Sequence, residues 1–405
     1  MIPFSPPHID DKVIDEVVAA LKSGWITTGP RTKQLEKNLA GYVGAQKVLC
    51  LNSATAGLEL MLRWFGVKEG DEVILPAYTY SATANVVIHC GATPVLVDVN
   101  ADDFNINVSE IKKHITEKTK VIMPVDIAGW PCDYKTIMKL VNDDDVKSKF
   151  KFSGAIQKIL GRILVLSDAA HSLGATVQGK YTGVLADATV FSFHAVKNLT
   201  TAEGGAVCLN LPAPFDAEII YSQLSVKALH GQNKDALAKT QKGNWEYDIV
   251  EAGYKWNMPD VLAAIGLVEL NRYESEILPE RRRIVQQYEN AFSKYSWAQL
   301  QTHQNENQNS SAHLYLLRIK NISEQQRNAI IQKIFDKDVS VNVHFKPLPL
   351  LSFYSVLGYE MKNYPVAFDN YSREISLPVF VGLTDEMIEQ VVVAVVNSVE
   401  EIISL

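Results

Sequence analysis

Short apolar runs alternate with helical patterns between residues 46 and 210. The runs that read as strands are Lys47–Leu51, Glu72–Leu75, Pro94–Val97, Val121–Val125, Ile163–Leu166, Thr189–Phe193 and Ala206–Leu209. A helix is expected from Ala56, with Leu58, Met61, Leu62 and Phe65 on one face. Strands separated by helical crossovers predict an α/β fold with a mostly parallel sheet covered on both faces. In such sheets ligands bind at the carboxyl ends of the strands, so the residues that follow these runs are the ones to search for chemistry.

The remainder of the chain predicts a second, smaller unit. Asn257–Asp260 reads as a helix start with Pro259 in the first turn, and a charged helical segment then continues to about residue 295. The Gln/Asn/Ser-rich stretch at 301–311 is expected to be an exposed loop. A strand at Leu314–Ile319, a helix at Glu324–Phe335, a strand at Ser340–Phe345 and a terminal helix from Thr384 would then form a small α/β domain. We therefore expect a large domain at residues 1–265 and a small C-terminal domain at 266–405.

Composition and charge narrow the class of protein. Hydrophobic residues make up 47% and charged residues 21% of the 405 residues, which is an ordinary globular balance. The net charge of −7 comes without a basic stripe, which argues against nucleic-acid binding. The four cysteines show neither the spacing of a metal site nor a disulfide framework. No apolar stretch is long enough for a membrane span and the start lacks a signal-peptide pattern, so we expect a cytoplasmic protein.

The most informative residues stand at the ends of two predicted strands. Asp168 ends an apolar run, where a carboxylate has no packing role but could face a cationic ring nitrogen. Lys197 follows the run ending at Phe193, and a lysine amine is the nucleophile needed toward an aldehyde. Taken singly, Asp168 could be a helix cap and His171 a structural histidine. Their conjunction at successive strand ends favours a site for pyridoxal 5′-phosphate (PLP).

Two further blocks fit the same kind of site. Asn52–Gly57 places small and hydroxyl residues between a strand and a helix, where free backbone N–H groups can hold a phosphate. Pro76–Ser81 follows the next strand, and its Tyr80 could stack on a flat heterocycle. Gly174–Lys180 has the spacing of a nucleotide P-loop, but the next residue is Tyr181 instead of Ser or Thr, and we reject that interpretation.

These blocks resemble the DegT/DnrJ/StrS family of nucleotide-sugar aminotransferases. The same resemblance extends over nearly the whole chain, through Ser23–Pro30, Phe191–Gly205, Gly253–Asp260 and Ile375–Pro378. Within the family the chain resembles the group that aminates the 4-keto pentose on the route to 4-amino-4-deoxy-L-arabinose. The resemblance implies a fold-type I PLP-dependent transferase with a seven-stranded sheet. It also implies transfer of an amino group from L-glutamate to a nucleotide-linked keto sugar, such as a UDP-4-keto-6-deoxy hexose, for polysaccharide biosynthesis.

The resemblance also implies roles for individual residues. Lys197 would form the Schiff base with PLP, Asp168 would pair with the pyridine nitrogen, and His171 would lie beside the ring. Tyr80 would lie on the ring face. The phosphate would be held by Thr55, Ala56 and Ser192.

Other implied roles involve a partner subunit or the substrate. The family forms homodimers with a shared active site, and Lys255 would reach a phosphate across the interface. Asn257 stands where many members have Arg. His344 and Lys346 are candidates for contact with the sugar or the diphosphate, with a surface pair at a strand end as an equal alternative. Residues of about 142–162 form an apparent insertion, which should lie at the amino end of the sheet, away from the chemistry.

Three alternatives stay open at this point. A sugar dehydratase that uses pyridoxamine phosphate would carry His in place of Lys197, so this residue argues against it. A non-catalytic PLP-binding protein would tolerate loss of Lys197 or Asp168, and neither is lost. An aminotransferase for a cyclitol or aminobenzoate precursor differs only in substrate contacts that the sequence leaves undetermined.

Overall fold

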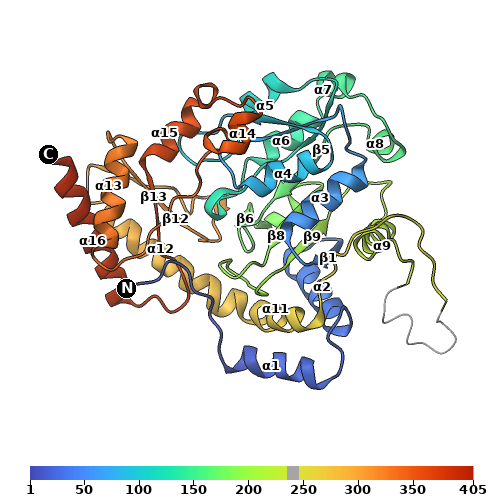
Figure 1. Cartoon of the computed structure of the whole chain (residues 1–405), viewed down its shortest axis with the longest axis horizontal. Helices are drawn as coiled ribbons and strands as arrows, with labels where there is room; N and C mark the ends of the chain where they lie inside the picture. The colour runs from blue at the N-terminus through green and yellow to red at the C-terminus, as the bar shows by residue number, and fades with distance from the viewer. Residues whose placement is uncertain (235–245, 405) are drawn as a thin grey trace.

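A seven-stranded sheet runs through the larger part of the protein (Figure 1). The computed structural model describes residues 1–234 and 246–404. The strands lie in the order β1-β9-β8-β5-β4-β2-β3, and only β9 runs antiparallel to its neighbours. Their bounds are β1 Lys47–Leu51, β2 Glu72–Pro76, β3 Thr93–Val97, β4 Thr119–Ile122, β5 Leu164–Asp168, β8 Ala188–Ser192 and β9 Gly205–Leu209. The α/β fold with a mostly parallel sheet is confirmed.

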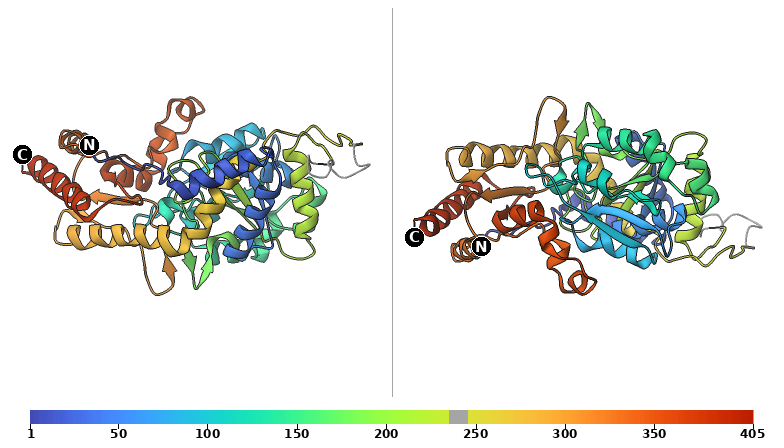
Figure 2. Two further views of the ribbon diagram at one scale, coloured as in Figure 1. Left: turned by 90° about the horizontal axis from the view of Figure 1, so that it is seen from below. Right: turned by 90° about the horizontal axis from the view of Figure 1, so that it is seen from above.

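Alternate residues of the central strands face two separate hydrophobic cores. In β1, Leu49 and Leu51 pack in the core beneath α3, whereas Val48 and Cys50 pack with α2 and α11. This alternation explains why helices cover both faces of the sheet in Figure 2. The helices of this part are α1 Asp11–Lys22, α2 Pro30–Val43, α3 Ala54–Phe65, α4 Ser81–His89, α5 Val108–His114, α6 Tyr134–Val141, α7 Asp144–Lys149, α8 Ala155–Leu160, α9 Ala217–Ala228 and α11 Asp260–Arg272.

The C-terminal part has its own core around a three-stranded sheet, in the order β10-β12-β13. Ile2 packs in this core, so the first residues of the chain lie with its last ones. Helix α13 begins with a capping box between Ser323 and Gln326. The bounds are α12 Leu278–Phe292, β10 Ala298–Gln299, β12 Tyr315–Ile319, α13 Glu324–Phe335, α14 Ser352–Val356, α15 Pro365–Arg373, β13 Glu374–Leu377 and α16 Asp385–Ile403.

Two segments differ from the sequence-based expectation. The predicted strand at 340–345 is wrong, because this segment has only a single bridge, from Asn342 to Ser376, and β13 takes the place beside β12. The stretch at 301–311 is not a fully exposed loop. Gln301, His303 and Ser311 are buried, and β11 (Gln308–Asn309) pairs with β6 (Thr176–Val177). Its polar composition concealed this burial, because its hydroxyls bond to distant backbone carbonyls, as the Ser311 hydroxyl does to His171.

Smaller differences concern where elements begin and end. Helix α3 begins at Ala54, two residues earlier than expected, and Pro259 is the residue that caps α11 instead of part of its first turn. Strand β4 ends at Ile122, and Val125 forms only an isolated bridge with Asp168. The rejected P-loop segment forms the hairpin β6–β7 (β7 Lys180–Tyr181) and leads into no long helix.

The segment between α13 and β13 packs back onto the large sheet. The hydroxyl of Tyr354 donates to Asn85 Oδ1 at 2.6 Å, and the N–H of Ala367 donates to the Asp98 carboxylate at 2.8 Å. Helix α11 packs on α1 and α2, whereas α12 packs on α16. The division of the chain at residue 265 stays a prediction.

The insertion folds as α7 and α8, next to the residues that enter the strands. Lys120 Nζ donates to the carbonyl of Lys151 at 2.5 Å, and Gln157 Nε2 donates to that of Phe65 at 3.1 Å. Lys120 lies in β4, and Phe65 ends the helix that leads to the start of β2. These contacts place the insertion at the amino end of the sheet. Within residues 1–234 and 246–404, no helix is long and apolar enough to cross a membrane.

Candidate active site

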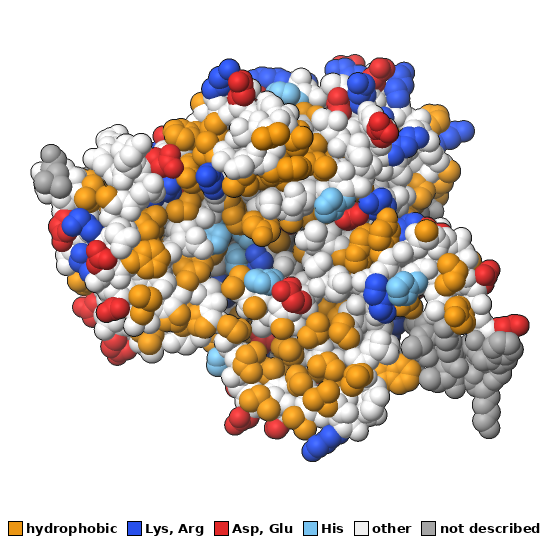
Figure 3. All heavy atoms as spheres, in the orientation of Figure 1, with side chains coloured by type: hydrophobic (Ala, Val, Ile, Leu, Met, Phe, Trp, Pro, Cys, Tyr) orange, Lys and Arg blue, Asp and Glu red, His pale blue; other side chains and the backbone are white. Residues whose placement is uncertain are grey.

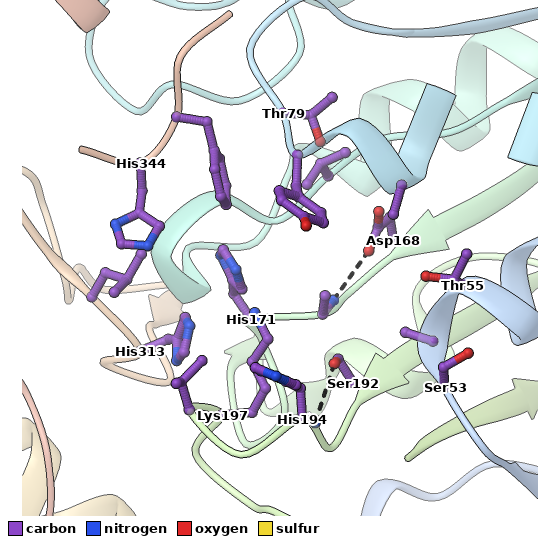
Figure 4. A pocket seen from close by; sticks show the side chains of 18 of the residues that line it. Ser53, Thr55, Thr79, Asp168, His171, Ser192, His194, Lys197, His313 and His344 are labelled. Carbon is purple, nitrogen blue, oxygen red and sulfur yellow. Dashed lines mark hydrogen bonds between the residues drawn. The ribbon is translucent and has the colours of Figure 1, made fainter. Parts of the chain in front are cut away.

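A pocket of about 360 Å³ opens at the carboxyl edge of the large sheet, where the C-terminal part meets it. It appears as the hollow near the middle of the face in Figure 3, with histidine side chains around it. Figure 4 shows His171, His313 and His344 on one side of this pocket and Ser53 and Thr55 on the other. The strands β1, β5 and β8 end at the pocket, as the sequence pattern predicted for a ligand site.

Lys197 follows β8 and lines the pocket. Its Nζ makes no hydrogen bond to any residue that the structure describes, and nearby groups act on it only through their charge and by burying it. Burial lowers the pKa of Lys197 to about 8, and the charge of Asp168 opposes this shift. The side chain is therefore an amine with an appreciable neutral fraction near physiological pH, which is the form that attacks a carbonyl carbon.

Asp168 ends β5 and is buried within the same pocket. The hydroxyl of Thr83 donates to its Oδ2 at 2.8 Å, and the N–H of Ala170 donates to its Oδ1 at 3.4 Å. Burial raises the pKa of Asp168, and these hydrogen bonds and Lys197 work against that rise. A buried carboxyl in this position is well placed for a cationic ring nitrogen. Thr83 escaped the sequence analysis because it lies two residues beyond the block ending at Ser81.

His171 forms one wall of the pocket with two side chains from the C-terminal part. Its ring lies 5.7 Å from that of Phe345 and 4.3 Å from that of His313, between centroids. The backbone N–H of Ala128 donates to His171 Nδ1 at 3.3 Å, which leaves Nε2 to carry the proton of the neutral ring. Burial, with the charge of Lys197, holds the pKa of His171 well below its usual range. His171 can therefore donate a hydrogen bond without carrying charge.

His313 is a pocket residue that the sequence analysis missed. Its Nδ1 bonds to Asn198 Oδ1 at 2.8 Å, and Asn198 Nδ2 donates to the carbonyl of Ser311 at 2.7 Å. Asn198 follows Lys197 directly, so this pair of bonds connects the lysine loop to the segment before β12. The only signal for His313 was its place just after the polar stretch that we interpreted as an exposed loop.

The start of α3 forms the opposite wall. The Ser53 hydroxyl caps the helix by accepting from the N–H of Ala56 at 3.0 Å, so that N–H group already has a partner. The N–H groups of Ala54 and Thr55 have no partner in the described residues. Ser53, Thr55 and Ser192 line the pocket, whereas Ala56 is buried behind it.

A glycine keeps this wall open. A Cβ atom at Gly205 would lie 2.4 Å from the nitrogen of Ala54, so only glycine lets the start of β9 pass so close to the helix start. The free N–H groups and hydroxyls beside it form a place for a phosphate.

The remaining predicted residues lie at the mouth of the pocket or outside it. Tyr80 is 64% exposed and lies at the mouth, 5.9 Å from Phe345 between ring centroids. Lys255 and Lys346 are exposed and do not line the pocket of the single chain. Asn257 Nδ2 donates to the Thr28 hydroxyl at 2.6 Å, so it holds the Ser23–Pro30 segment.

His344 lines the pocket next to Phe4, with ring centroids 5.4 Å apart. Burial lowers the pKa of His344 to about 3, and the charge of Lys197 adds to the shift. The imidazole is therefore neutral, which makes it a partner for a hydroxyl and a weak one for a phosphate.

The pocket residues fit PLP. The amine of Lys197, the carboxyl of Asp168, the proton on His171 Nε2 and the free N–H groups at α3 match the aldehyde, the ring nitrogen, the phenolic oxygen and the phosphate of that cofactor. Among the described residues, no group of three or more His, Cys, Asp or Glu side chains is arranged to hold a metal ion.

The class that this fold and this pocket define is that of the PLP-dependent aminotransferases. The model of the DegT/DnrJ/EryC1/StrS aminotransferase family matches residues 7–149 and 154–396. The chain belongs to this family, as its sequence motifs predicted. The break in the match falls within the insertion between α7 and α8.

Similar proteins cover the whole chain. It is 33% identical over 398 residues to the spore coat polysaccharide biosynthesis protein SpsC of Bacillus subtilis, covering 97% of this chain and 96% of that one. It is 32% identical over 407 residues to a UDP-4-amino-4-deoxy-L-arabinose–oxoglutarate aminotransferase of Shewanella sediminis, covering 97% of each. A putative sugar aminotransferase from Streptococcus pneumoniae, solved in its PMP form, superposes with a TM-score of 0.95 at 47% identity over 99% of this chain and 100% of that one. Its PLP form gives a TM-score of 0.94 at 46% identity, over 99% of each chain.

Proposed function

We propose that this enzyme moves an amino group from L-glutamate to a nucleotide-linked keto sugar, such as a UDP-4-keto-6-deoxy hexose. The observation that carries the proposal is the Lys197 amine, which has no hydrogen-bond partner among the described residues and shares one pocket with buried Asp168 and the open N-terminus of α3. When bound, PLP supplies an electron sink for the negative charge that develops at the carbon exchanging its amino group.

Each pocket residue would then have its own part in the reaction. Lys197 Nζ would hold the cofactor covalently at rest, and as a free amine it would carry a proton between the reacting substrate carbon and the cofactor carbon that exchanges the amino group. The Asp168 carboxyl keeps a proton on the ring nitrogen, and Thr83 fixes the orientation of that carboxyl. His171 Nε2 would donate to the phenolic oxygen. Thr55, Ser192 and the N–H groups at the start of α3 would hold the phosphate, and Tyr80 would cover the ring at the mouth.

The substrate class rests on the relatives and on the neutral wall of the pocket. One relative is named for a UDP-linked amino sugar and another for polysaccharide biosynthesis, which supports a nucleotide sugar for this chain. Neutral histidines are suited to sugar hydroxyls, and three of them gather beside Lys197. The name of the Shewanella relative supports L-glutamate as the donor, since oxoglutarate is the keto acid that L-glutamate becomes when it gives up its amino group.

We further propose a homodimer in which each subunit completes the site of the other. Helix α1 carries an apolar stripe at Ile14, Val18 and Leu21, which are 50%, 37% and 53% exposed. Figure 3 shows hydrophobic side chains gathered over the region of α1 and α11. Lys255 directs no group into the pocket of its own chain, which supports a role in the pocket of a partner.

The test uses the two half-reactions separately. The PLP-loaded enzyme is mixed with L-glutamate and the release of 2-oxoglutarate is measured, after which UDP-4-keto-6-deoxy hexose is added and its amination is followed by mass spectrometry. A Lys197→Ala variant should lose both half-reactions, whereas a Lys180→Ala variant, altered at an exposed lysine outside the pocket, should keep both. Amination of a cyclitol but of no nucleotide sugar in the same assay would contradict the proposed substrate class.

A further inference from the structure

A chain of hydrogen bonds runs from the interior of the C-terminal part to His344 in the pocket. Ser376 Oγ donates to Glu374 Oε1 at 2.5 Å, and His344 Nδ1 bonds to the same Ser376 Oγ at 2.9 Å. The backbone N–H of His344 donates to Glu374 Oε2 at 3.1 Å. Glu374 and Ser376 are two residues apart in β13, and strand geometry therefore puts both side chains on the same face.

Glu374 has no evident packing reason to be a carboxylic acid. It is fully buried in a strand whose other residues include Ile375 and Leu377 of the hydrophobic core. Its polar surroundings are Ser376, the N–H of His344 and the guanidinium groups of Arg327 and Arg318. A buried carboxyl is costly unless such partners satisfy it, so its hydrogen bonds must compensate for its burial.

These contacts fix His344 from several sides. The side chain bonds to Ser376, the backbone N–H to Glu374, and the backbone carbonyl accepts from the hydroxyl of Tyr78 at 2.6 Å. Phe4 stacks on the ring with an interplanar angle of 17°. Because Nδ1 is held by Ser376, Nε2 is the nitrogen left for a ligand. It has no hydrogen-bond partner in the described chain and is not among the buried unpaired atoms.

The position of this nitrogen suggests which substrate group it meets. His344 and Lys197 line the same pocket, and the keto carbon must lie at Lys197 for the amino group to be transferred. In a 4-keto-6-deoxy hexose, the carbons beside the keto carbon are C3, which bears a hydroxyl, and C5, which does not. A neutral imidazole next to the keto carbon is therefore matched by the C3 hydroxyl.

We propose that Glu374 and Ser376 are positioning residues that hold His344 Nε2 toward the substrate hydroxyl adjacent to the keto carbon, and so set the enzyme's preference for a sugar with that hydroxyl. The inference rests on the proposed function, since it requires a keto sugar in this pocket. Glu374 and Ser376 do not touch the substrate and act only through His344.

The test compares two ligands on the PLP-loaded enzyme, which binds a keto sugar without turning it over. The ligands are UDP-4-keto-6-deoxy hexose and its 3-deoxy analogue, and their affinities are measured by calorimetry. The wild-type enzyme should bind the 3-hydroxy ligand about tenfold more tightly, which is the usual worth of one hydrogen bond. Ser376→Ala and Glu374→Gln should reduce this ratio to about twofold or less and leave the affinity for the 3-deoxy ligand unchanged.

Two further variants separate positioning from folding. Ser398→Ala removes another buried serine hydroxyl of the same domain, one that has no hydrogen-bond partner in the described part of the chain, and should keep the full tenfold ratio. Ser376→Thr keeps the hydroxyl and should restore most of the ratio even if Ser376→Ala folds poorly. The inference is overturned if Ser376→Ala keeps the ratio, or if it weakens both ligands equally as a structural lesion would. If the wild type binds neither ligand, the proposed substrate class itself fails; if it binds both without preference, only the role of His344 fails.

Discussion

Lys197 and Asp168 are both buried, and burial shifts the pKa values of an amine and a carboxyl in opposite directions. The pKa of Lys197 falls to about 8 and that of Asp168 rises, so each group is brought nearer to the pH of the cell. Their mutual attraction opposes both shifts. The pair therefore combines a nucleophilic amine with a carboxyl that can hold a proton on a neighbouring nitrogen.

This balance predicts the pH at which Lys197 becomes reactive. In the enzyme without PLP, labelling of Lys197 by acetic anhydride should increase as pH rises and reach half of its maximum near pH 8, because only the neutral amine reacts. Asp168→Asn should move that midpoint to lower pH, because the attraction that favours the charged amine is lost. Labelling is measured at several pH values by mass spectrometry of the peptide that contains Lys197. A midpoint near that of a free lysine, or an upward movement in Asp168→Asn, would contradict this account.

At this scale the sequence predicted the residues whose signal is local. Lys197 and Asp168 stand at the ends of apolar strands, and that position could be recognised from the neighbouring residues alone. Thr83, His313 and Ser376 reach the same site through contacts with residues 85, 115 and 32 positions away. No periodicity within a segment carries that information, because a hydrogen bond across the fold depends on how elements pack.

At the scale of elements, the first turn of α3 has two functions. Its Ser53 cap stabilises the helix, and the N–H groups that the cap leaves free are those that face the pocket. Because Ser53 both caps the helix and borders the pocket, a change at this residue should affect the stability of the fold and the affinity for the cofactor together. The proposed phosphate-binding role of this turn can be separated from the capping role by comparison with a cap elsewhere in the protein.

Ser53→Ala is expected to cost about 1 kcal/mol of unfolding free energy and to weaken PLP binding about tenfold. The first effect comes from the lost cap, and the second from the loss of a pocket hydroxyl and of the ordered first turn. Ser323→Ala is the matched control, because Ser323 caps α13 in the C-terminal part, far from the pocket. It should cost about as much stability and leave PLP affinity unchanged. Chemical denaturation and a PLP titration check both variants; equal PLP affinity in the two would exclude a phosphate role for Ser53.

Element prediction succeeded where a segment's own pattern decides its structure. Helix α13 has the predicted bounds because a capping box and an apolar face agree within twelve residues. The segment at 340–345 has an equally apolar, strand-like pattern. Its backbone instead forms hydrogen bonds with Glu374, Ser376 and Tyr78. Strand β13 therefore pairs with β12, and this segment holds His344 in place. Tertiary contacts overrode a local preference there.

At the scale of the whole molecule, the single chain leaves features that a second copy would use. The apolar stripe of α1 is exposed. Lys255 is exposed and does not line the pocket of its own chain, although its backbone carbonyl accepts from Asn52, beside the proposed phosphate site. A symmetric dimer would bring the same surfaces of two chains together and could carry each Lys255 to the other pocket. In that arrangement, one site is built from the Lys197 of one subunit and the Lys255 of its partner.

This arrangement can be tested by mixing two impaired enzymes. Lys197→Ala removes the reactive amine, and Lys255→Ala removes the proposed phosphate contact, so each homodimer should have low activity. After the two are unfolded and refolded together, half of the dimers should be mixed, and each mixed dimer contains one site with both lysines intact, so about a quarter of all sites should work. Activity is measured with L-glutamate and UDP-4-keto-6-deoxy hexose, and the same refolding of each variant alone serves as control. If Lys255 instead acts within its own subunit, every site in the mixture lacks one of the two lysines, because every subunit carries one of the two substitutions. Activity should then not rise above the average of the two parents.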